Sequence, residues 1–247
     1  PRLRPIEWNA AEARHVRSDK GGGHWEFRRE IPTTWPVSVG GLDLIAKPTP
    51  FGHLGLFAEH AAHWAWLKAR ITALSARLGR PVKVLNLFAY TGGATLAAAQ
   101  AGAHVTHVDA ARGIVEWAKE NARANGLLEA PLRWMVDDAL GFCRREARRE
   151  AQYDGVILDP PSFGRGPKGE IWKIEDHLAP LLEATVEIAT RRPGFLLFSC
   201  HSQGFSPSGT PRVLGDVFDL APGHECGEMS ITEADGRWLP SGTFLRF

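Results

Sequence analysis

The sequence predicts an α/β fold in which a small β-rich region precedes a doubly wound, mostly parallel sheet that ends in an antiparallel hairpin. Three observations support this prediction. From Pro81 onward, short apolar runs alternate with segments of helical periodicity, which is typical of successive βαβ units. Before this segment, two alternating runs meet at Gly40-Gly41. After it, the turn-rich segment 232–241 separates two further strand-like runs.

The composition suits a chain with one large core. Of the 247 residues, 44% are apolar, and 29 Lys and Arg nearly balance 28 Asp and Glu. This balance gives no direct argument for a nucleic-acid or membrane partner. No apolar run approaches the ~18–20 residues of a membrane helix, and no signal-peptide pattern is present, so we expect a cytoplasmic protein. Cys143, Cys200 and Cys226 lack zinc-type spacing and predict reduced thiols, with Cys143 and Cys226 in the core.

Residues 1–56 carry the signals of the small β-rich region. Two runs with strand character follow one another, and the Gly40-Gly41 pair inside the second is a strong hairpin signal. A helix is predicted over 59–79, because apolar residues recur there at helical intervals. We therefore expect a second, ligand-binding domain over residues 57–247. The apolar positions of the predicted helix are Ala62, Trp66, Ile71, Leu74 and Leu78.

The alternation after Pro81 predicts the elements of the main sheet in order. The predicted strands cover residues 82–90, 104–109, 132–136, 153–159 and 194–201. The predicted helices between them cover residues 94–102, 113–126, 139–150 and 177–190. Strands 224–231 and 242–247 then form the terminal antiparallel hairpin. Because strands linked through helices pair in parallel, these elements give a Rossmann-like sheet.

Glycines and carboxylates follow three of these strands, where ligands bind in such sheets. Gly92 and Gly93 come after the first strand, where backbone must approach a ligand closely. Asp109 ends the second strand, 17 positions after Gly92, near the distance at which an acidic side chain binds ribose hydroxyls. Asp137-Asp138 end the third, although Asp138 alone could equally cap a helix. The joint pattern predicts an adenosine cofactor, and a dinucleotide is disfavoured because G-x-G-x-x-G is missing.

Four segments together resemble a known family: "VLNLFAYTGGATLAAAQAGAHVTHVDAARGIVEWAKENARANGL", "DDA", "ILDPPSFG" and "FSCHSQG". They resemble the class I S-adenosylmethionine-dependent methyltransferases, and among these the bacterial 23S rRNA large-subunit methyltransferase-like group. The resemblance extends from about Gly52 to Gln203. It implies a methyltransferase domain with S-adenosylmethionine as cofactor, S-adenosylhomocysteine as product and RNA, in this group rRNA, as partner.

The resemblance also implies roles for single residues. Asp109 is expected at the cofactor ribose, Asp138 with Ala139 at its adenine, and Asp159 beside its methyl group. The residues implied to flank its methionine part follow the first predicted strand: Phe88, Tyr90, Thr91, Gly92 and Gly93.

The segment "GLFAEH" departs from the group, which usually has Phe-x-Asp-Gln-Arg at this point. No cofactor role is therefore predicted for Phe57, Glu59 or His60. The spacing of His53, His60 and His63 matches no zinc motif, so core or solvent roles are expected for these histidines instead of a metal site.

The motif "DPPSF" is predicted to contact the substrate. Asp159 can accept a hydrogen bond from a base amino or ring N–H group, and the Pro160 carbonyl is free to accept another. Phe163 offers a face to a base that has left its stack. The prolines restrict the backbone, so these groups are held in place before substrate arrives.

The loop after this motif is expected to contact RNA as well. It contains Arg165, Lys168 and Trp172. Basic side chains suit phosphates and an indole suits base stacking. We therefore assign all three to substrate binding.

Cys200 leads to the finest prediction, methylation of cytosine C5. Its thiolate would add to C6 of the pyrimidine and make C5 nucleophilic, with His201 and His53 assisting. Alternatively, Cys200 is a buried thiol, and an exocyclic amine or ring nitrogen of nucleic acid or protein is methylated through Asp159, Pro160 and Phe163. A third possibility is a non-catalytic cofactor-binding protein that serves RNA assembly.

Overall fold

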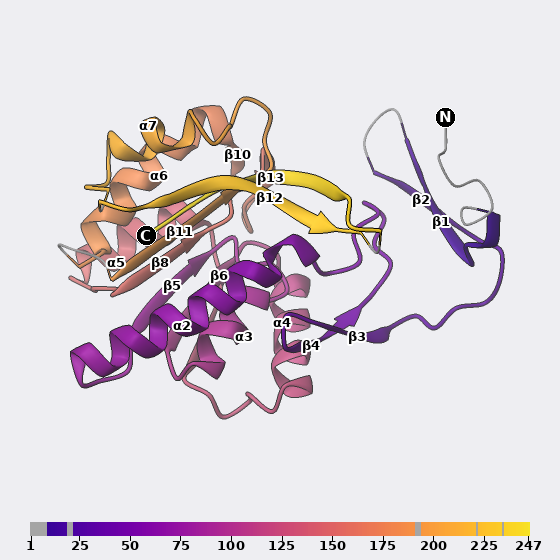
Figure 1. Ribbon diagram of the computed structural model, residues 1–247, viewed down its shortest axis with the longest axis horizontal. Helices are drawn as coiled ribbons and strands as arrows, with labels where there is room; N and C mark the ends of the chain where they lie inside the picture. Colours follow the sequence, from indigo (N-terminus) through magenta and orange to yellow (C-terminus); the bar gives the residue numbers. More distant parts are fainter. Residues whose placement is uncertain (1–8, 19–21, 191–193, 221, 234) are drawn as a thin grey trace.

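A seven-stranded sheet forms the centre of the computed structural model, which describes residues 9–18, 22–190, 194–220, 222–233 and 235–247. The strand order is β12-β13-β11-β8-β5-β6-β7, and Figure 1 labels all of these strands except β7. The first five of these strands along the chain pair in parallel. The last two along the chain, β12 and β13, form an antiparallel hairpin, and β13 pairs antiparallel with β11. This arrangement confirms the predicted fold class. The strands are β5 (Lys83–Leu87), β6 (His104–Asp109), β7 (Leu132–Val136), β8 (Gly155–Leu158), β11 (Phe195–Cys200), β12 (Glu225–Thr232) and β13 (Trp238–Arg246).

The strand order reverses between β5 and β8. After β5, the chain adds β6 and β7 on one side, and it then returns to place β8 and β11 on the other. Because the connections at the carboxyl ends of β5 and β8 diverge, a crevice opens there. The functional site is expected at this edge of the sheet.

Helices cover both faces of the sheet. On one face, α2 (Ala61–Leu78) and α3 (Gly93–Gln100) pack together, and on the other α5 (Ala139–Arg148) packs against α6 (Ile174–Ile188). Further helices are η1 (Ala58–His60), α4 (Arg112–Ala124) and α7 (Thr210–Gly215).

Alternate residues of β11 belong to different cores. Leu197 packs with α2 and α3, whereas Phe198 and Cys200 pack with α5 and α6. This alternation follows from the two-residue period of a strand. It decides which side chains near the end of β11 can reach the crevice.

Helix α2 has the predicted extent but a different buried face. Gly79 ends it in the left-handed region at φ 65°, and its N–H donates to Ser75 O. Ile71 and Leu74 are buried as expected, but Ala62 and Leu78 are exposed. Because the helix packs on α3 and on one face of the sheet, its buried face is instead His63, Trp64, Leu67, Ile71 and Leu74.

Two hairpins precede α2. The first pairs β1 (Ala13–Arg17) with β2 (Gly23–Phe27), and the second pairs β3 (Trp35–Val39) with β4 (Leu42–Ala46). Gly40 and Gly41 form the turn of the second hairpin at φ 59° and 76°, which confirms the predicted hairpin.

The second hairpin is packed into the main domain. Leu42 and Leu44 of β4 are buried in one cluster with residues of α3 and α4, and the Ile45 N–H donates to Asn121 Oδ1 at 2.8 Å. The domain boundary at residue 56 remains a prediction. The first eight residues of the expected N-terminal region lie outside the described residues.

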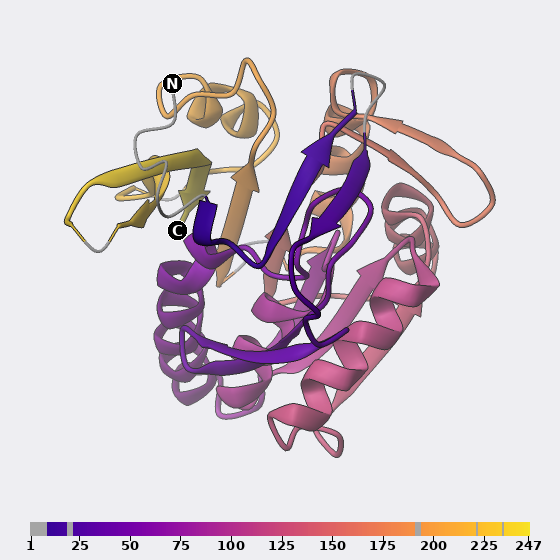
Figure 2. The same cartoon turned by 90° about the vertical axis from the view of Figure 1, so that its right-hand side faces the viewer.

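The loop after β8 forms a hairpin that the sequence did not predict. β9 (Phe163–Arg165) pairs with β10 (Ile171–Lys173), and the hairpin projects from the sheet (Figure 2). Its turn is closed by the Gly166 N–H, which donates to Glu170 O at 2.7 Å. Elsewhere, no helix in the described part of the chain combines the length and apolar character that a membrane span requires.

Candidate active site

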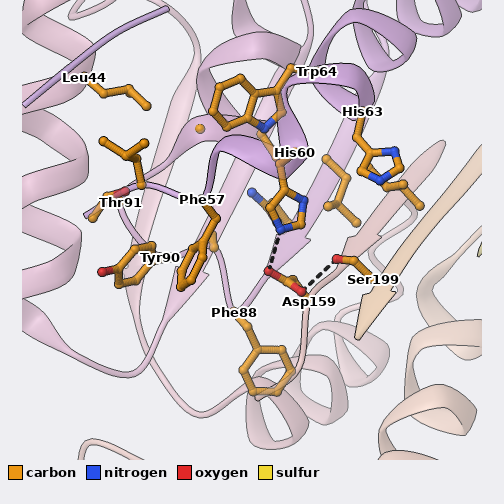
Figure 3. Close-up of a pocket in the computed structure, with 17 residues that line it drawn as sticks. Leu44, Phe57, His60, His63, Trp64, Phe88, Tyr90, Thr91, Asp159 and Ser199 are labelled. Carbon is orange, nitrogen blue, oxygen red and sulfur yellow. Dashed lines mark hydrogen bonds and ion pairs between the residues drawn. The ribbon is translucent and has the colours of Figure 1, made fainter. Parts of the chain in front are cut away.

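The carboxyl ends of the parallel strands enclose a cavity of about 560 Å³. Its walls include Phe88 after β5, Asp109 at the end of β6, Asp138 after β7 and Asp159 after β8. A narrow inner extension of about 60 Å³ reaches Trp64 of α2 (Figure 3). The cavity volume lies within the range of about 300–1,000 Å³ that is usual for small-molecule sites.

The turn after β5 is held in a strained conformation. Phe88 and Tyr90 have positive φ values of 54° and 49°, and such positions cost on the order of 1–3 kcal/mol for residues other than glycine. Gly92 follows at φ 92° and precedes α3. Both aromatic residues line the cavity, so this turn forms part of its wall. The sequence showed aromatic residues here but gave no sign of their left-handed backbone.

Asp109 fixes this turn from the neighbouring strand. Its Oδ2 accepts a hydrogen bond from the Tyr90 N–H at 2.9 Å, and its Oδ1 accepts one from the Ala111 N–H at 3.0 Å. Burial raises the pKa of Asp109. A carboxylate has about four acceptor positions, so two remain for hydroxyl groups of a ligand in the cavity.

Asp138 has the capping role that its sequence position allowed. Its Oδ2 accepts a hydrogen bond from the Gly141 N–H at 2.7 Å, at the start of α5. Asp138 and Ala139 both line the cavity, as does Asp137, which pairs with Arg145. A contact between Asp138 and an adenine remains a prediction.

Thr91 and Gly93 serve the packing of the turn. The Thr91 hydroxyl donates to Gly55 O at 2.6 Å, and the side chain is buried. A Cβ atom at Gly93 would lie 2.4 Å from the Trp64 ring, so only glycine fits against the indole. Both residues line the inner extension, and their predicted contact with a cofactor remains a prediction.

Asp159 lies where three segments of the chain meet: η1, the end of β8 and the end of β11. Its Oδ1 accepts a hydrogen bond from the Ser199 hydroxyl at 2.7 Å. His60 Nε2 lies 3.5 Å from Oδ2, as Figure 3 shows, and His201 Nδ1 lies 3.7 Å from Oδ1. Pro160 continues the wall of the cavity beside this carboxylate. The predicted catalytic carboxylate therefore has one hydroxyl and two imidazoles around it.

Glu59 supports this group from behind. Its Oε1 accepts hydrogen bonds from the Ser241 hydroxyl at 2.6 Å and from His201 Nε2 at 3.2 Å. Burial raises the pKa of Glu59, but these hydrogen bonds outweigh it and lower the pKa to about 2. The hydrogen bond with Glu59 in turn raises the pKa of His201. Glu59 is thus ionised, and the N–H on Nε2 of His201 points at it.

The sequence assigned no role to the residues that η1 brings to the site. Phe57 lies against Tyr90 and His201, with ring centroids 5.4 Å and 5.8 Å apart. His60 lies beside Asp159, and Glu59 bonds to His201. The available signal was an acidic residue and a histidine inside the otherwise apolar segment "GLFAEH". Only the fold shows that this segment lies opposite β8 and β11.

Cys200 does not lie in the cavity. Its side chain is 1% exposed, in the core formed with α6, and burial raises its pKa. The neighbouring residues Ser199 and His201 approach Asp159 instead, as strand alternation requires. A thiolate at Cys200 is therefore disfavoured, and the thiol matches the alternative of a buried core residue.

The β9–β10 hairpin divides the predicted substrate residues into two groups. Phe163 is 55% exposed, and Arg165 and Lys168 are exposed as well. Trp172 is only 5% exposed: its ring packs on Phe88 with centroids 4.8 Å apart, and its Nε1–H donates to Pro161 O at 2.7 Å. In this position Trp172 anchors the hairpin and has no free face for a base.

The chain matches a protein family over most of its length. Residues 8–200 match the family described as S-adenosylmethionine-dependent methyltransferase. A curated relative, ribosomal RNA large subunit methyltransferase K/L of Vibrio cholerae, is 31% identical over 192 residues, which are 75% of this chain and 25% of the relative. The protein of the same name from Cellvibrio japonicus is 31% identical over 194 residues, 76% of this chain and 24% of the relative. The chain thus spans about a quarter of the length of these curated relatives.

Solved structures show the same fold. A SAM-dependent methyltransferase from Agrobacterium tumefaciens is similar with a TM-score of 0.89 and 38% identity, over all of this chain and 80% of that one. A putative SAM-dependent methyltransferase from Streptococcus mutans has a TM-score of 0.73 at 19% identity, over 91% of this chain and 57% of that one. At that identity, the second similarity concerns the fold alone.

Proposed function

The chain belongs to the S-adenosylmethionine-dependent methyltransferase family, and we propose that it transfers the methyl group to a nitrogen of an RNA base. The choice of nitrogen rests on one observation: Asp159 lines the cavity, and no cysteine among the described residues does so. The names of the curated relatives, ribosomal RNA large subunit methyltransferases, support RNA as the substrate class.

The residues around the cavity fit the cofactor of this family. Two acceptor positions of Asp109 remain for the ribose hydroxyls, and Asp138 lies at the end of the next strand for the adenine edge. Phe88 and Tyr90 line the same cavity as these carboxylates and Asp159. When bound, S-adenosylmethionine supplies an electrophilic methyl group on its sulfonium centre.

Asp159 and Pro160 would orient the nitrogen that is methylated. Asp159 accepts a hydrogen bond from an amino or ring N–H group, and the Pro160 carbonyl accepts a second where the nitrogen carries two hydrogens. The lone pair then points away from both acceptors. The Ser199 hydroxyl and the two prolines keep the acceptors in place, so little ordering is left to the substrate complex.

The β9–β10 hairpin would hold the RNA beside this point. Phe163 is exposed next to the catalytic motif and can stack on the target base or its neighbour. Arg165 and Lys168 are exposed on the same hairpin and suit phosphate groups. This arrangement places stacking and charge on one projecting element.

Mapping of the methylated atom tests the proposal. Ribosomal RNA from a strain that lacks the gene is incubated with the chain and methyl-labelled cofactor, digested to nucleosides and analysed by mass spectrometry. A methyl group on an amino or ring nitrogen is the expected result. A methyl group on cytosine C5, together with a covalent complex on RNA that contains 5-fluorocytidine, would restore the Cys200 mechanism. Labelling of protein but not RNA would overturn the substrate class.

A further inference from the structure

His60, Asp159 and His201 form a cluster that methyl transfer to nitrogen does not require. One ligand atom from each residue lies within 4.8 Å of the others. The three residues come from η1, from the end of β8 and from the end of β11, so no sequence spacing connects them. Two imidazoles and one carboxylate form a common ligand set for a divalent transition-metal ion.

The two imidazole nitrogens face different oxygens of the Asp159 carboxylate, and each lies too far away for a direct hydrogen bond of good geometry. His60 Nε2 lies 3.5 Å from Asp159 Oδ2, and His201 Nδ1 lies 3.7 Å from Oδ1. Ligand bonds of about 2.1 Å in a tetrahedron separate neighbouring ligand atoms by about 3.4 Å. His60 Nε2 is shielded from solvent and has no hydrogen-bond partner. An ion would give this buried nitrogen the partner it lacks.

The surroundings of the cluster provide the orientation that metal ligands need. A ligating histidine usually donates its other ring N–H to a carboxylate, which leaves the free nitrogen directed at the metal. His201 has this arrangement, because its Nε2 bonds to Glu59 Oε1 while its Nδ1 faces Asp159. Ser241 holds Glu59 and Ser199 holds Asp159 by hydrogen bonds. The carboxylates of Glu59 and Asp159 are therefore both held in place.

We propose that His60, Asp159 and His201 bind a divalent transition-metal ion such as zinc, with Glu59 as the supporting carboxylate. His60 and Asp159 line the inner extension, and Asp159 and His201 line the main cavity, so the ion lies where the two meet. Three protein ligands leave a coordination position open for a heteroatom from the cavity. That ligand is a base oxygen or ring nitrogen next to the methylated atom; only this use of the ion rests on the proposed function.

Metal titration of the chain alone tests the site without RNA or cofactor. The chain, without a histidine tag and freed of metal by a chelator, is titrated with zinc by calorimetry and with cobalt(II) by visible absorption. One ion per chain should bind stoichiometrically at micromolar protein. Glu59→Gln should weaken zinc binding about 10- to 100-fold, as loss of a supporting carboxylate usually does. His60→Ala and His201→Ala should each weaken it further.

His53→Ala is the matched control, because His53 lines the same cavity but lies outside the cluster. It should bind zinc like the unchanged chain, and thermal unfolding verifies that each variant is folded. No stoichiometric binding would overturn the proposal, and so would binding that survives both His60→Ala and His201→Ala. Binding of the ion together with a chain that methylates no RNA would leave the site in place and reject the proposed function.

Discussion

The carboxyl ends of β5 and β6 and the carboxyl ends of β8 and β11 form two halves of one cavity, and the two halves are held together differently. In the first half, the carboxylate of Asp109 accepts hydrogen bonds from two backbone N–H groups, that of Tyr90 in the turn 19 positions earlier and that of Ala111 just after it. In the second half, side chains bind side chains over long separations, up to 182 positions between Glu59 and Ser241. The first half is therefore rigid by backbone geometry, whereas the second depends on the packing of distant elements.

Each half contains a buried imidazole nitrogen without a hydrogen-bond partner among the described residues. In the first half this is His107 Nε2 on β6, and in the second it is His60 Nε2 on η1. His107 packs against Trp134, with ring centroids 4.8 Å apart, whereas His60 lines the inner extension of the cavity. The nitrogen without a partner in the second half is therefore the one that adjoins the cavity.

Trp172 should give the largest effect, because it joins the two halves through Phe88 and Pro161. Trp172→Ala should lower the free energy of unfolding by about 3 kcal/mol, as truncation of a buried aromatic side chain usually does. Urea unfolding measures it. Trp172→Phe keeps most of the ring and should lose about 1 kcal/mol for the hydrogen bond. A variant with unchanged stability but weaker RNA binding would instead support the stacking role predicted from the sequence.

Asp159→Asn tests the second half alone. The amide keeps the shape of the carboxylate, but its oxygen is uncharged and accepts a hydrogen bond from the substrate N–H group less strongly. The kcat should therefore fall about 100-fold. Binding of S-adenosylhomocysteine, measured by calorimetry, should stay the same, because Asp109 and Asp138 are untouched. A loss of cofactor affinity at unchanged kcat would show that Asp159 binds the cofactor and does not orient the substrate.

Asp109→Ala tests the first half in the same way. Loss of a charged hydrogen-bonding partner should weaken cofactor binding by about 1–3 kcal/mol. Since the Tyr90 N–H also loses its acceptor, the strained turn should loosen. Calorimetry with S-adenosylhomocysteine measures the affinity. Unchanged affinity would contradict the assignment of Asp109 to the ribose.

The Glu59–His201 pair should make the second half sensitive to acid. The pKa of Glu59 is lowered from 4.5 to about 2, so its contribution to stability is present above pH 4.5 and is lost as the pH falls toward 2. The pKa of His201 is raised from 6.5, so its contribution is present below pH 6.5 and is lost at higher pH. The pair therefore stabilises most between these values.

Glu59→Gln tests this pH dependence. The difference in unfolding free energy between the unchanged chain and the variant should be on the order of 1 kcal/mol near pH 5 and should shrink on acidification. Urea unfolding from about pH 6 to about pH 3 follows it. A difference that does not change over this range would show that folding does not shift the pKa of Glu59.

Cys200→Ala should have the smallest effect on activity, because its thiol lies in the core behind the second half. Methylation of RNA should stay near the level of the unchanged chain, with a modest loss of stability from the small cavity. A folded Cys200→Ala variant without activity would instead support Cys200 as the nucleophile and cytosine C5 as the methylated atom.

The sequence predicted the first half more completely than the second, for a physical reason. Asp109 and the turn after β5 are close in the chain, and their roles follow from strand ends and connection lengths. Asp159 was predicted for the same reason. The partners of Asp159 were not, because His60 and Ser199 reach it from other elements.

Two further differences come from side-chain direction. Cys200 was predicted at the site from its place at a strand end, but the alternation along β11 directs it to the opposite core. Trp172 was predicted to be available to RNA from its place in a loop, but that loop folds into a hairpin and buries the indole against Phe88. Composition cannot show either direction, because both depend on which elements become neighbours.

The hydrogen bond between Ser241 and Glu59 has a consequence for the order in which the chain becomes competent during its synthesis. The pairing of Asp109 with Tyr90 can close once β6 has been made, whereas Glu59 must wait for β13. Contacts between residues far apart in the chain form later than local ones. A nascent chain that stops before Ser241 therefore has its cofactor turn but lacks a support of the group around Asp159, so the ability to methylate comes last.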